Sequence, residues 1–244
     1  MIDCIMMAYN DEALLPFMLS HYKFADKIHV IIDSATTDRS AEICKKCPNV
    51  DVSYFTFPAG FDDELKVAKI NEVAKTCQDW IINVDTDEFA FVDLNTPLDQ
   101  YLKSTDVDIV YVNYWMVYRH RSEKDLDPSL PALPQRRYGD PKQGEGYGFA
   151  LFNKPAIARR SLNPQWGIGN HWIFTDAPFK SSIINGAHWA MADAEIAIKR
   201  RVRGHQKRQS TNNKAGGLCV QHWTITEEEI RAECVAHLDD ARLF

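Results

Sequence analysis

Three acidic residues fall within four positions of the chain, directly after a short apolar segment: Asp85, Asp87 and Glu88 follow residues 80–84 (WIINV). Like charges this close repel one another, so such a cluster is stable mainly when a cation or a set of hydrogen-bond donors neutralises it. One interpretation is a divalent-metal site, in which one carboxylate binds the ion and the other binds the ion or a ribose. The other interpretation is a turn at the end of a strand, in which Asp87 caps the element that follows. The spacing alone leaves both open.

The apolar segment before the acids is typical of a central strand, because it is rich in β-branched residues with one polar break. Similar patterns predict strands at residues 2–8, 27–33 and 51–57, and helices from about residue 12, at 38–46 and at 62–77. This alternation at short spacing predicts a parallel sheet with helices on its faces. Ligands of such sheets bind beyond the carboxyl ends of the strands. The loops at 9–12, 33–38 and 85–88 should therefore converge on one crevice, which favours the metal interpretation.

The second part of the chain has a different pattern. It predicts a short helix at 97–104, an aromatic strand at 108–120, a long proline-containing loop at 121–146 and a strand at 148–157. After a loop at 161–169, extended pieces at 171–174 and 182–189 lead into a helix at 192–203, for which Gly204 is the expected C-cap. A last helix should span 226–243, with a capping box that starts at Thr224 or Thr226.

Composition excludes several classes of protein. The 244 residues carry a net charge of −6, which argues against general nucleic-acid binding. No run of roughly 18 apolar residues predicts a transmembrane helix, and residues 1–7 do not resemble a signal peptide. The six cysteines are scattered, and the Cys44-x-x-Cys47 pair falls in an expected helix without a second pair nearby. We therefore expect a chain that works in a reducing compartment, the cytoplasm.

Three blocks of sequence together carry a resemblance to a known family: MAYNDE at 7–12, DSATTDRS at 33–40 and WIINVDTDEF at 80–89. In this order they resemble the family-2-like glycosyltransferases of GT-A fold, and most closely the subgroup with a D-x-D-E-F metal motif. Looser resemblances follow in FNKPAIARR, GNHWI and GAHWAMADAEIAIKRRVRG, so the similar region covers about residues 2–204.

The resemblance implies an α/β fold of the GT-A (Rossmann-like) type, with a mostly parallel central sheet flanked by helices, a C-terminal acceptor-side region and terminal helices. Residues 1–95 would form the nucleotide-sugar-binding half, 96–204 the half that completes the acceptor and metal sites, and 205–244 a C-terminal helical extension.

Individual roles also follow from the resemblance. Asp33 would accept a hydrogen bond from the base, Asp85 would bind ribose or metal, and Asp87 would bind the metal. His188, and also His171, would correspond to a late histidine that binds metal or diphosphate. The residues implied to contact the donor besides Asp33 and Asp85 are Ala8, Tyr9, Asn10 and Glu12. Basic side chains that could assist the leaving group are Lys154, Arg159, Arg160 and the run at 199–208, and of these Arg160 is assigned to the donor site.

The catalytic base is less well defined. The subgroup often carries Arg-Ser after the late histidine, where this chain has Ala192 and Asp193. Compared with other family-2 members, Asp193 matches an aspartate that opens a helix and acts as the base; the alternative is an ordinary N-cap. Asp176 and Glu145 are further candidates.

These roles imply a metal-dependent glycosyltransferase of the hexosyl or related type, expected to be inverting. It would move a sugar from a UDP- or GDP-type nucleoside-diphosphate donor to a carbohydrate or lipid-linked acceptor, in polysaccharide or glycoconjugate synthesis. Oxygen ligands favour Mg²⁺ or Mn²⁺, and an added imidazole favours Mn²⁺. The basic run at 199–208 is either a solvated helix face or a surface for an anionic acceptor or a membrane.

Two alternatives stay open at this point. A nucleotidyltransferase would share the sheet and the acids but would usually carry a glycine-rich phosphate loop after the first strand, and AYNDEALLP contains no glycine. A catalytically silent nucleotide-sugar-binding protein would keep the pocket without turnover.

Overall fold

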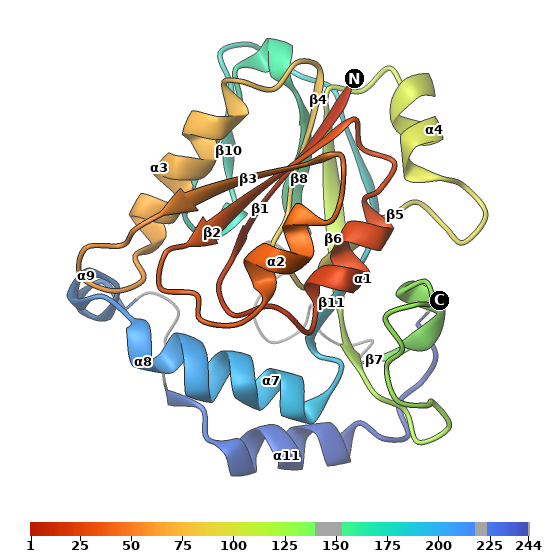
Figure 1. Cartoon of the computed structure of the whole chain (residues 1–244). Coiled ribbons are helices and arrows are strands. Elements are labelled where there is room, and N and C mark those ends of the chain that lie inside the picture. Colours follow the sequence, from red (N-terminus) through yellow and green to blue (C-terminus); the bar gives the residue numbers. More distant parts are fainter. Residues whose placement is uncertain (140–152, 218–223, 244) are drawn as a thin grey trace.

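The computed structural model describes residues 1–139, 153–217 and 224–243. Its first part is the alternating arrangement expected from the sequence (Figure 1). Four parallel strands lie side by side in the order β3-β2-β1-β4. Their bounds are β1 (Ile2–Ala8), β2 (Lys27–Asp33), β3 (Val50–Phe55) and β4 (Trp80–Asn83), and the helices between them are α1 (Leu15–His21), α2 (Ser40–Lys45) and α3 (Asp63–Ala74).

Helices cover both faces of this sheet because successive strand residues point to opposite sides. In β1, Cys4 and Met6 belong to the core cluster that also contains residues of α1 and α2. Ile5 between them belongs to a second cluster, which includes Ile70 of α3 and Trp166. A strand buried on both faces explains the continuous apolar pattern of the segment.

The sheet continues beyond β4 in the order β8-β6-β11-β5. β6 and β11 run in the same direction as β1 to β4, whereas β8 and β5 run in the opposite direction. This confirms the mostly parallel sheet of the GT-A type. The strands are β5 (Glu88–Phe91), β6 (Ile109–Tyr118), β8 (Asn153–Arg159) and β11 (Ser181–Met191), and the short β7 (Tyr138–Gly139) pairs with β6.

Smaller elements connect these strands. They are α4 (Leu98–Ser104), the 3₁₀ turns η1 (Leu133–Gln135), η2 (Arg160–Leu162) and η3 (Ile168–Asn170), and a separate hairpin of β9 (Gln165–Trp166) and β10 (Ile173–Phe174). The expected strand at 148–157 is present as β8 where it is described; residues 148–152 lie outside the described part. The segment 121–139, expected to be a loop, also contains η1 and β7.

Helices from the C-terminal region run across the carboxyl ends of the parallel strands (Figure 1). Their order is α7 (Ala194–Arg200), a π-helical turn (Arg201–His205), α8 (Gln206–Arg208) and α9 (Thr211–Ala215). α11 (Glu227–Ala236) packs against α7 through a small cluster around Ile198 and Ile230. Among the described helices, none is long and apolar enough to cross a membrane.

Two expected helix boundaries were wrong. Gly204 does not end the helix but lies inside the π turn, where a Cβ would stand 3.5 Å from the Tyr9 ring. The helix after Thr226 has the expected Thr226–Glu229 capping box but ends at Ala236 instead of 243. There the chain turns, and the Leu238 carbonyl accepts a hydrogen bond from the Arg121 amide.

Candidate functional site

The acid cluster lies at the carboxyl end of β4, in the turn that leads to β5. Thr86, Asp87 and Glu88 are buried, at 2%, 6% and 1% exposure. The chain continues as a strand from Glu88, and the Asp87 carboxylate faces side chains of other elements. The alternative in which Asp87 caps the following element is therefore not what the structure contains.

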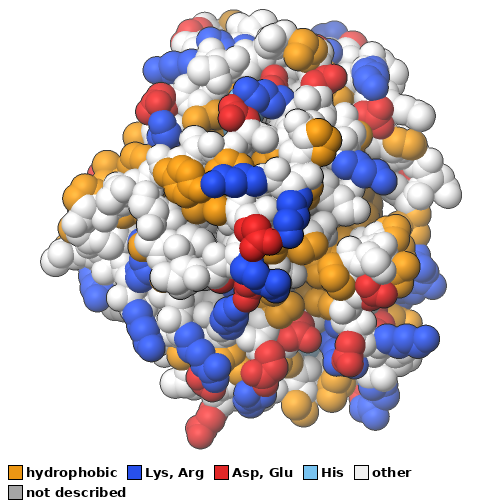
Figure 2. All heavy atoms as spheres, in the orientation of Figure 1, with side chains coloured by type: hydrophobic (Ala, Val, Ile, Leu, Met, Phe, Trp, Pro, Cys, Tyr) orange, Lys and Arg blue, Asp and Glu red, His pale blue; other side chains and the backbone are white. Residues whose placement is uncertain are grey.

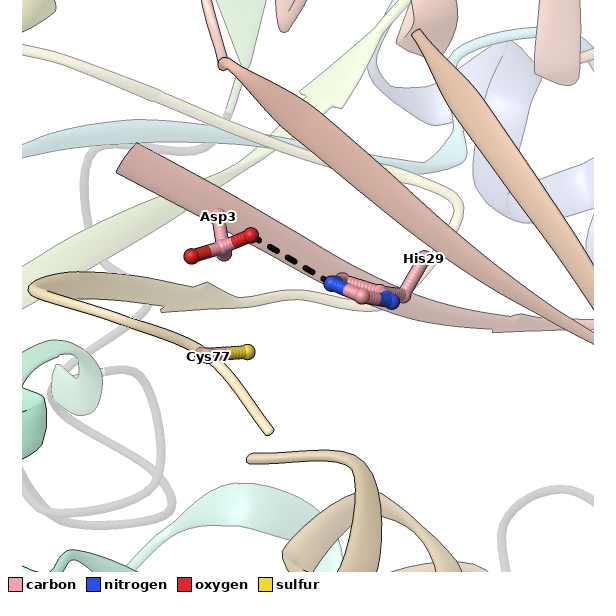
Figure 3. Close-up of side chains that lie close together, drawn as sticks. All are labelled: Asp3, His29 and Cys77. Carbon is pink, nitrogen blue, oxygen red and sulfur yellow. Dashed lines mark hydrogen bonds and ion pairs between the residues drawn. The ribbon is translucent and has the colours of Figure 1, made fainter. Parts of the chain in front are cut away.

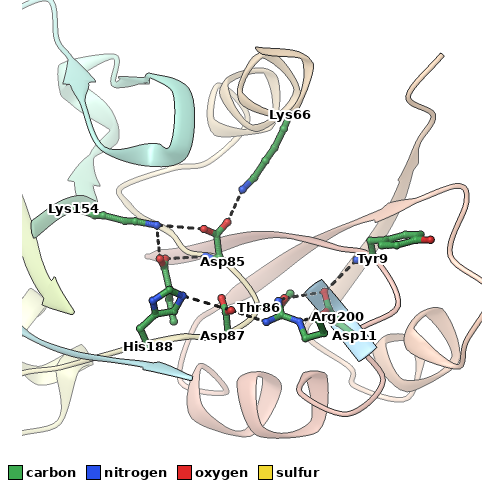
Figure 4. A network of polar contacts seen from close by, with 10 residues as sticks. Tyr9, Asp11, Lys66, Asp85, Thr86, Asp87, Lys154, His188 and Arg200 are labelled. Atoms are coloured by element: carbon green, nitrogen blue, oxygen red, sulfur yellow. Dashed lines mark hydrogen bonds and ion pairs between the residues drawn. The ribbon is translucent and has the colours of Figure 1, made fainter. Parts of the chain in front are cut away.

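Cations from three separate elements neutralise the two aspartates (Figure 4). The Asp85 carboxylate accepts hydrogen bonds from two lysine Nζ atoms: Lys66 of α3 donates to Oδ1 at 2.6 Å, and Lys154 of β8 donates to Oδ2 at 3.3 Å. Asp87 Oδ2 lies 2.5 Å from Nη1 of Arg200, at the end of α7, and 3.5 Å from Nε2 of His188 on β11. Lys154 also contacts Glu88. The cluster is thus stable because side chains distant in sequence supply the opposite charge.

Arg200 links this cluster to the loop after β1. Its Nε donates to Asp11 Oδ1 at 2.7 Å, and its Nη2 donates to Thr86 Oγ1 at 3.0 Å. Thr86 in turn donates to Asp11 Oδ2 at 2.8 Å. One guanidinium therefore joins the carboxyl ends of β1 and β4, as the geometry of a planar group with several donors allows.

The electrostatics keep both aspartates ionised. Burial acts to raise the pKa of Asp87, but its interactions with Arg200 and His188 outweigh burial and hold the pKa well below its usual range. Burial opposes ionisation of Asp85 in the same way, and Lys66 and Lys154 lower its pKa. Ionised carboxylate oxygens are the groups that a divalent cation or a sugar hydroxyl can bind.

The loops after β1 and β2 join this site, as the sequence predicts. Asn10 adopts a left-handed φ of 52°, and its side-chain oxygen accepts the amides of Thr37 at 2.8 Å and Asp38 at 3.3 Å. Glu12 accepts from Lys199 at 2.8 Å. The predicted convergence of the segments at 9–12, 33–38 and 85–88 is present.

Asp33 and Tyr9 form a second part of the crevice. Asp33, at the end of β2, is 1% exposed, and its Oδ1 accepts the Ala35 amide at 2.9 Å. Its Oδ2 lies 2.6 Å from Arg208 Nη1 without making a hydrogen bond to any described residue. The Arg208 guanidinium also lies over the Tyr9 ring, 3.9 Å from its centroid.

His171 approaches the site from the tip of the β9–β10 hairpin. The neighbouring Asn170 accepts from Asn83, at the end of β4, at 3.1 Å. Burial, followed by the charge of Lys154, lowers the pKa of His171 to about 4, so its imidazole is neutral at pH 7. A neutral imidazole can bind a metal ion or donate one hydrogen bond.

Two predicted site residues lie at the opposite edge of the sheet. Because β8 is antiparallel to β4, its last residue pairs with Trp80, the first residue of β4. The Arg160 amide accordingly donates to Asp79 O at 2.6 Å, and Asp176 is held beside the β8 end by Asn163 at 2.8 Å. Arg160 as a donor-binding residue and Asp176 as a base are not supported by these positions.

The other two candidate bases have different outcomes. Asp193 follows β11 at the carboxyl edge and is the N-cap of α7, accepting the amides of Glu195 at 3.0 Å and Ile196 at 3.1 Å. Glu145 lies outside the described residues.

Four site residues were not predicted individually: Asp11, Lys66, Arg200 and Arg208. Both arginines belong to the basic run at 199–208, which was noted only as a run. Asp11 belongs to the MAYNDE block, but Lys66 has no sequence signal beyond its place on an amphipathic helix.

A further polar cluster lies near the amino ends of the strands (Figure 3). Potential ligand atoms of Asp3, His29 and Cys77 lie within 4.8 Å of one another. Both Asp3 oxygens already have partners, His29 Nε2 at 3.3 Å and the Gln78 amide at 3.1 Å. Burial raises the pKa of Cys77 to about 12, which keeps the thiol protonated. We therefore interpret this cluster as a structural link between β1, β2 and the end of α3.

The sheet and its polar carboxyl edge define an α/β protein of GT-A fold. The family described as Glycosyl transferase family 2 matches residues 3–161, and the chain belongs to this family. No curated protein matched the chain in a sequence comparison.

Several solved structures are similar at low identity. S. aureus TarS is 13% identical with a TM-score of 0.45, over 97% of this chain and 43% of that one. TarS 1–349 in complex with UDP is 12% identical with a TM-score of 0.43, over 97% and 88% of the two chains. The 4-diphosphocytidyl-2C-methyl-D-erythritol synthase from Anaerococcus prevotii is 14% identical with a TM-score of 0.41, over 76% and 86%.

Proposed function

We propose that the chain transfers a sugar from a UDP- or GDP-type nucleoside-diphosphate donor to a hydroxyl of a carbohydrate or lipid-linked acceptor, with the help of Mn²⁺ or Mg²⁺. The observation that carries this proposal is the pair of aspartates, Asp85 and Asp87, that basic side chains hold at the carboxyl edge next to Asp33 and Tyr9. This edge is where parallel α/β sheets bind nucleotides.

The side chains around Asp87 fit a divalent ion. Asp87 Oδ2 and His188 Nε2 are 3.5 Å apart, so one ion could contact both atoms. A carboxylate with an imidazole suits Mn²⁺, and Asp85 would add an oxygen ligand or bind the ribose. When bound, the ion would neutralise the charge that develops on the leaving diphosphate.

The chain's own cations would complete the diphosphate site. Lys66, Lys154 and Arg200 already point at the acid cluster from different sides. Positive groups preorganised around a developing negative charge lower the barrier for its formation. The proposed site combines residues from the expected nucleotide half (1–95) and from the following half (96–204).

An inverting transfer needs a carboxylate that takes the acceptor proton. Of the three candidates, Asp193 is supported best for this role, because it follows β11 at the carboxyl edge. Its Oδ1 is engaged in the helix cap, so the base and the stereochemical course stay predictions that a substitution must test.

A thermal-shift screen tests the proposal. UDP and GDP, each with and without Mn²⁺, should raise the unfolding temperature of the wild-type chain by mass action, and the shift should be larger with Mn²⁺. Asp87→Asn should lose the Mn²⁺-dependent part. Arg160→Ala is the matched control, because it removes a cation from the opposite edge and should keep both shifts. The absence of a shift with every nucleoside diphosphate would contradict the proposal.

A further inference from the structure

We propose that the Arg208 guanidinium is an internal occupant of the position for the donor's base, and that nucleotide binding displaces it. The inference rests on the proposed function, because Asp33 and Tyr9 form a base site only if the chain binds a nucleotide.

The contacts of Arg208 are those that a base would make. Its guanidinium stacks on the Tyr9 ring with 3.9 Å between Cζ and the ring centroid, and its Nη1 lies 2.6 Å from Asp33 Oδ2. A guanidinium is planar and carries N–H donors in its plane, as do uracil and guanine. At this separation no ring fits between Tyr9 and Arg208, so a base stacked on this face of Tyr9 requires the guanidinium to leave.

Asp33 indicates that Arg208 is an imperfect ligand there. Although the residue is 1% exposed, its Oδ2 accepts no hydrogen bond from any described residue and is paired only with the charge of Arg208. A buried acceptor without a donor costs free energy that a well-placed N–H recovers. A base N–H directed at Oδ2 would therefore improve on the internal contact.

The main chain of Arg208 is fixed while its side chain ends in the crevice. Arg208 O accepts the Phe61 amide at 2.6 Å, and Phe61 O accepts the Ser210 amide at 2.9 Å. Gly60 makes this approach possible: its φ is +90°, and a Cβ there would stand 2.4 Å from Arg208 O. Asn213, fully buried, adds hydrogen bonds to Asp63 and Phe61. Displacement is thus a movement of one long side chain and not of the whole segment.

The π turn before α8 supports this arrangement. Arg200, His205 and Arg208 all contact the site, through Asp87, Tyr9 and Asp33 respectively. Other basic side chains of α7 and α8 contribute to the charged outer surface in this region (Figure 2). Single π turns within helices occur frequently at functional sites. Here the wider π turn changes the angle between successive side chains around the helix axis. Arg200 before the turn and Arg208 after it can therefore both point toward the site.

Calorimetric binding of UDP and GDP to the wild-type chain and to Arg208→Ala tests the inference. If Arg208 leaves the position open in only about one-tenth of the molecules, its removal tightens the apparent affinity roughly tenfold. Electrostatics alone predicts the reverse, because the variant loses a positive charge near an anionic ligand. Lys207→Ala is the matched control: it removes an exposed charge from the same helix and should not tighten binding.

Inorganic pyrophosphate separates the base position from the diphosphate site. It has no base, so Arg208→Ala should not tighten its binding. Because Arg208→Ala leaves Asp33 without its cation, the unfolding temperature of this variant is also measured without ligand. Arg208→Gln, which keeps a planar donor, serves as a second variant and should show a smaller gain in nucleotide affinity. Equal or weaker nucleotide binding by folded Arg208 variants overturns the inference and leaves the proposed function standing. No nucleotide binding by the wild type or by any variant overturns both.

Discussion

Both edges of the sheet contain buried carboxylates, but different kinds of groups neutralise these carboxylates at the two edges. At the amino edge, Asp3 is held by the Gln78 amide and by His29 of the adjacent strand. At the carboxyl edge, the partners of Asp85 and Asp87 are the ends of lysine and arginine side chains from α3, β8 and α7, together with His188 of β11. The first set of contacts comes from a backbone amide and from a histidine on the adjacent strand, whereas the second comes mainly from long, flexible side chains.

This difference distinguishes a structural cluster from a binding site. A backbone amide cannot leave its partner without loss of the strand or turn that carries it. A lysine or arginine can rotate to bind an incoming anion, and its carboxylate partner can then bind a cation. Long-chain ion pairs at the amino edge, such as Arg159 with Asp79 and Lys27 with Asp51, are partly exposed and contribute little to stability. Buried acids with exchangeable counterions therefore mark the functional edge.

The largest expected effect comes from Asp87→Asn compared with Asp3→Asn. The Asp87 variant should lower kcat/KM for sugar transfer or donor hydrolysis in Mn²⁺ by about 10²- to 10³-fold, because it removes charge from the proposed metal site. Asp3→Asn should leave kcat/KM unchanged but lower the unfolding free energy by about 1 to 3 kcal/mol. Unaltered donor turnover in Asp87→Asn would contradict the metal site, and an absence of turnover in the wild type would favour a silent binding protein.

A smaller effect concerns acid sensitivity of the carboxyl edge. Burial, followed by the charge of Arg200, lowers the pKa of His205 to about 3. Lys66 and Arg201 also lower this pKa, whereas Asp87 raises it. The unfolded residue titrates near pH 6.5. Between these values the unfolded chain binds the proton and the folded chain does not, so stability decreases as the pH falls.

We therefore expect His205 to contribute a loss of about 1 to 2 kcal/mol in unfolding free energy between pH 7 and pH 5. Denaturant unfolding of the wild type and of His205→Asn at both pH values measures this contribution. The variant should lose less stability than the wild type over this interval, since the group that titrates is absent. An equal loss in both chains would exclude His205 as the cause.

Sequence patterns predicted the parallel part of the fold because its signals are local. Strand β1 and strand β2 have the expected bounds, and the Thr226–Glu229 capping box is present. β5 was missed because four residues after an acidic turn look like part of the loop. What makes Glu88–Phe91 a strand is its pairing with Asn185–His188 of β11, which is a contact between distant segments.

The remaining wrong or missing predictions at the site depend on the direction in which a strand runs and on which face of a helix points inward. Arg160 was assigned to the donor as one of several basic side chains that could assist the leaving group, but β8 is antiparallel and carries it to the far edge. Arg200 and Arg208 could not be separated from their neighbours, because the inward face of that helix depends on the π turn. Asp87 and His188, by contrast, were predicted together and do lie together.

The smallest expected effect distinguishes the two roles predicted for Asp193. Asparagine caps a helix nearly as well as aspartate, whereas alanine costs about 1 kcal/mol. If the cap is the role of Asp193, Asp193→Asn should keep both stability and transfer, and Asp193→Ala should lose about 1 kcal/mol of unfolding free energy. We expect this result, in which Asp193 acts only as a cap. The helix that Asp193 caps carries Arg200 of the site at its other end, so the cap alone accounts for the position of Asp193. A loss of transfer of about a hundredfold or more in a folded Asp193→Asn variant would instead identify Asp193 as the base, since only the proton-accepting carboxylate distinguishes it from asparagine.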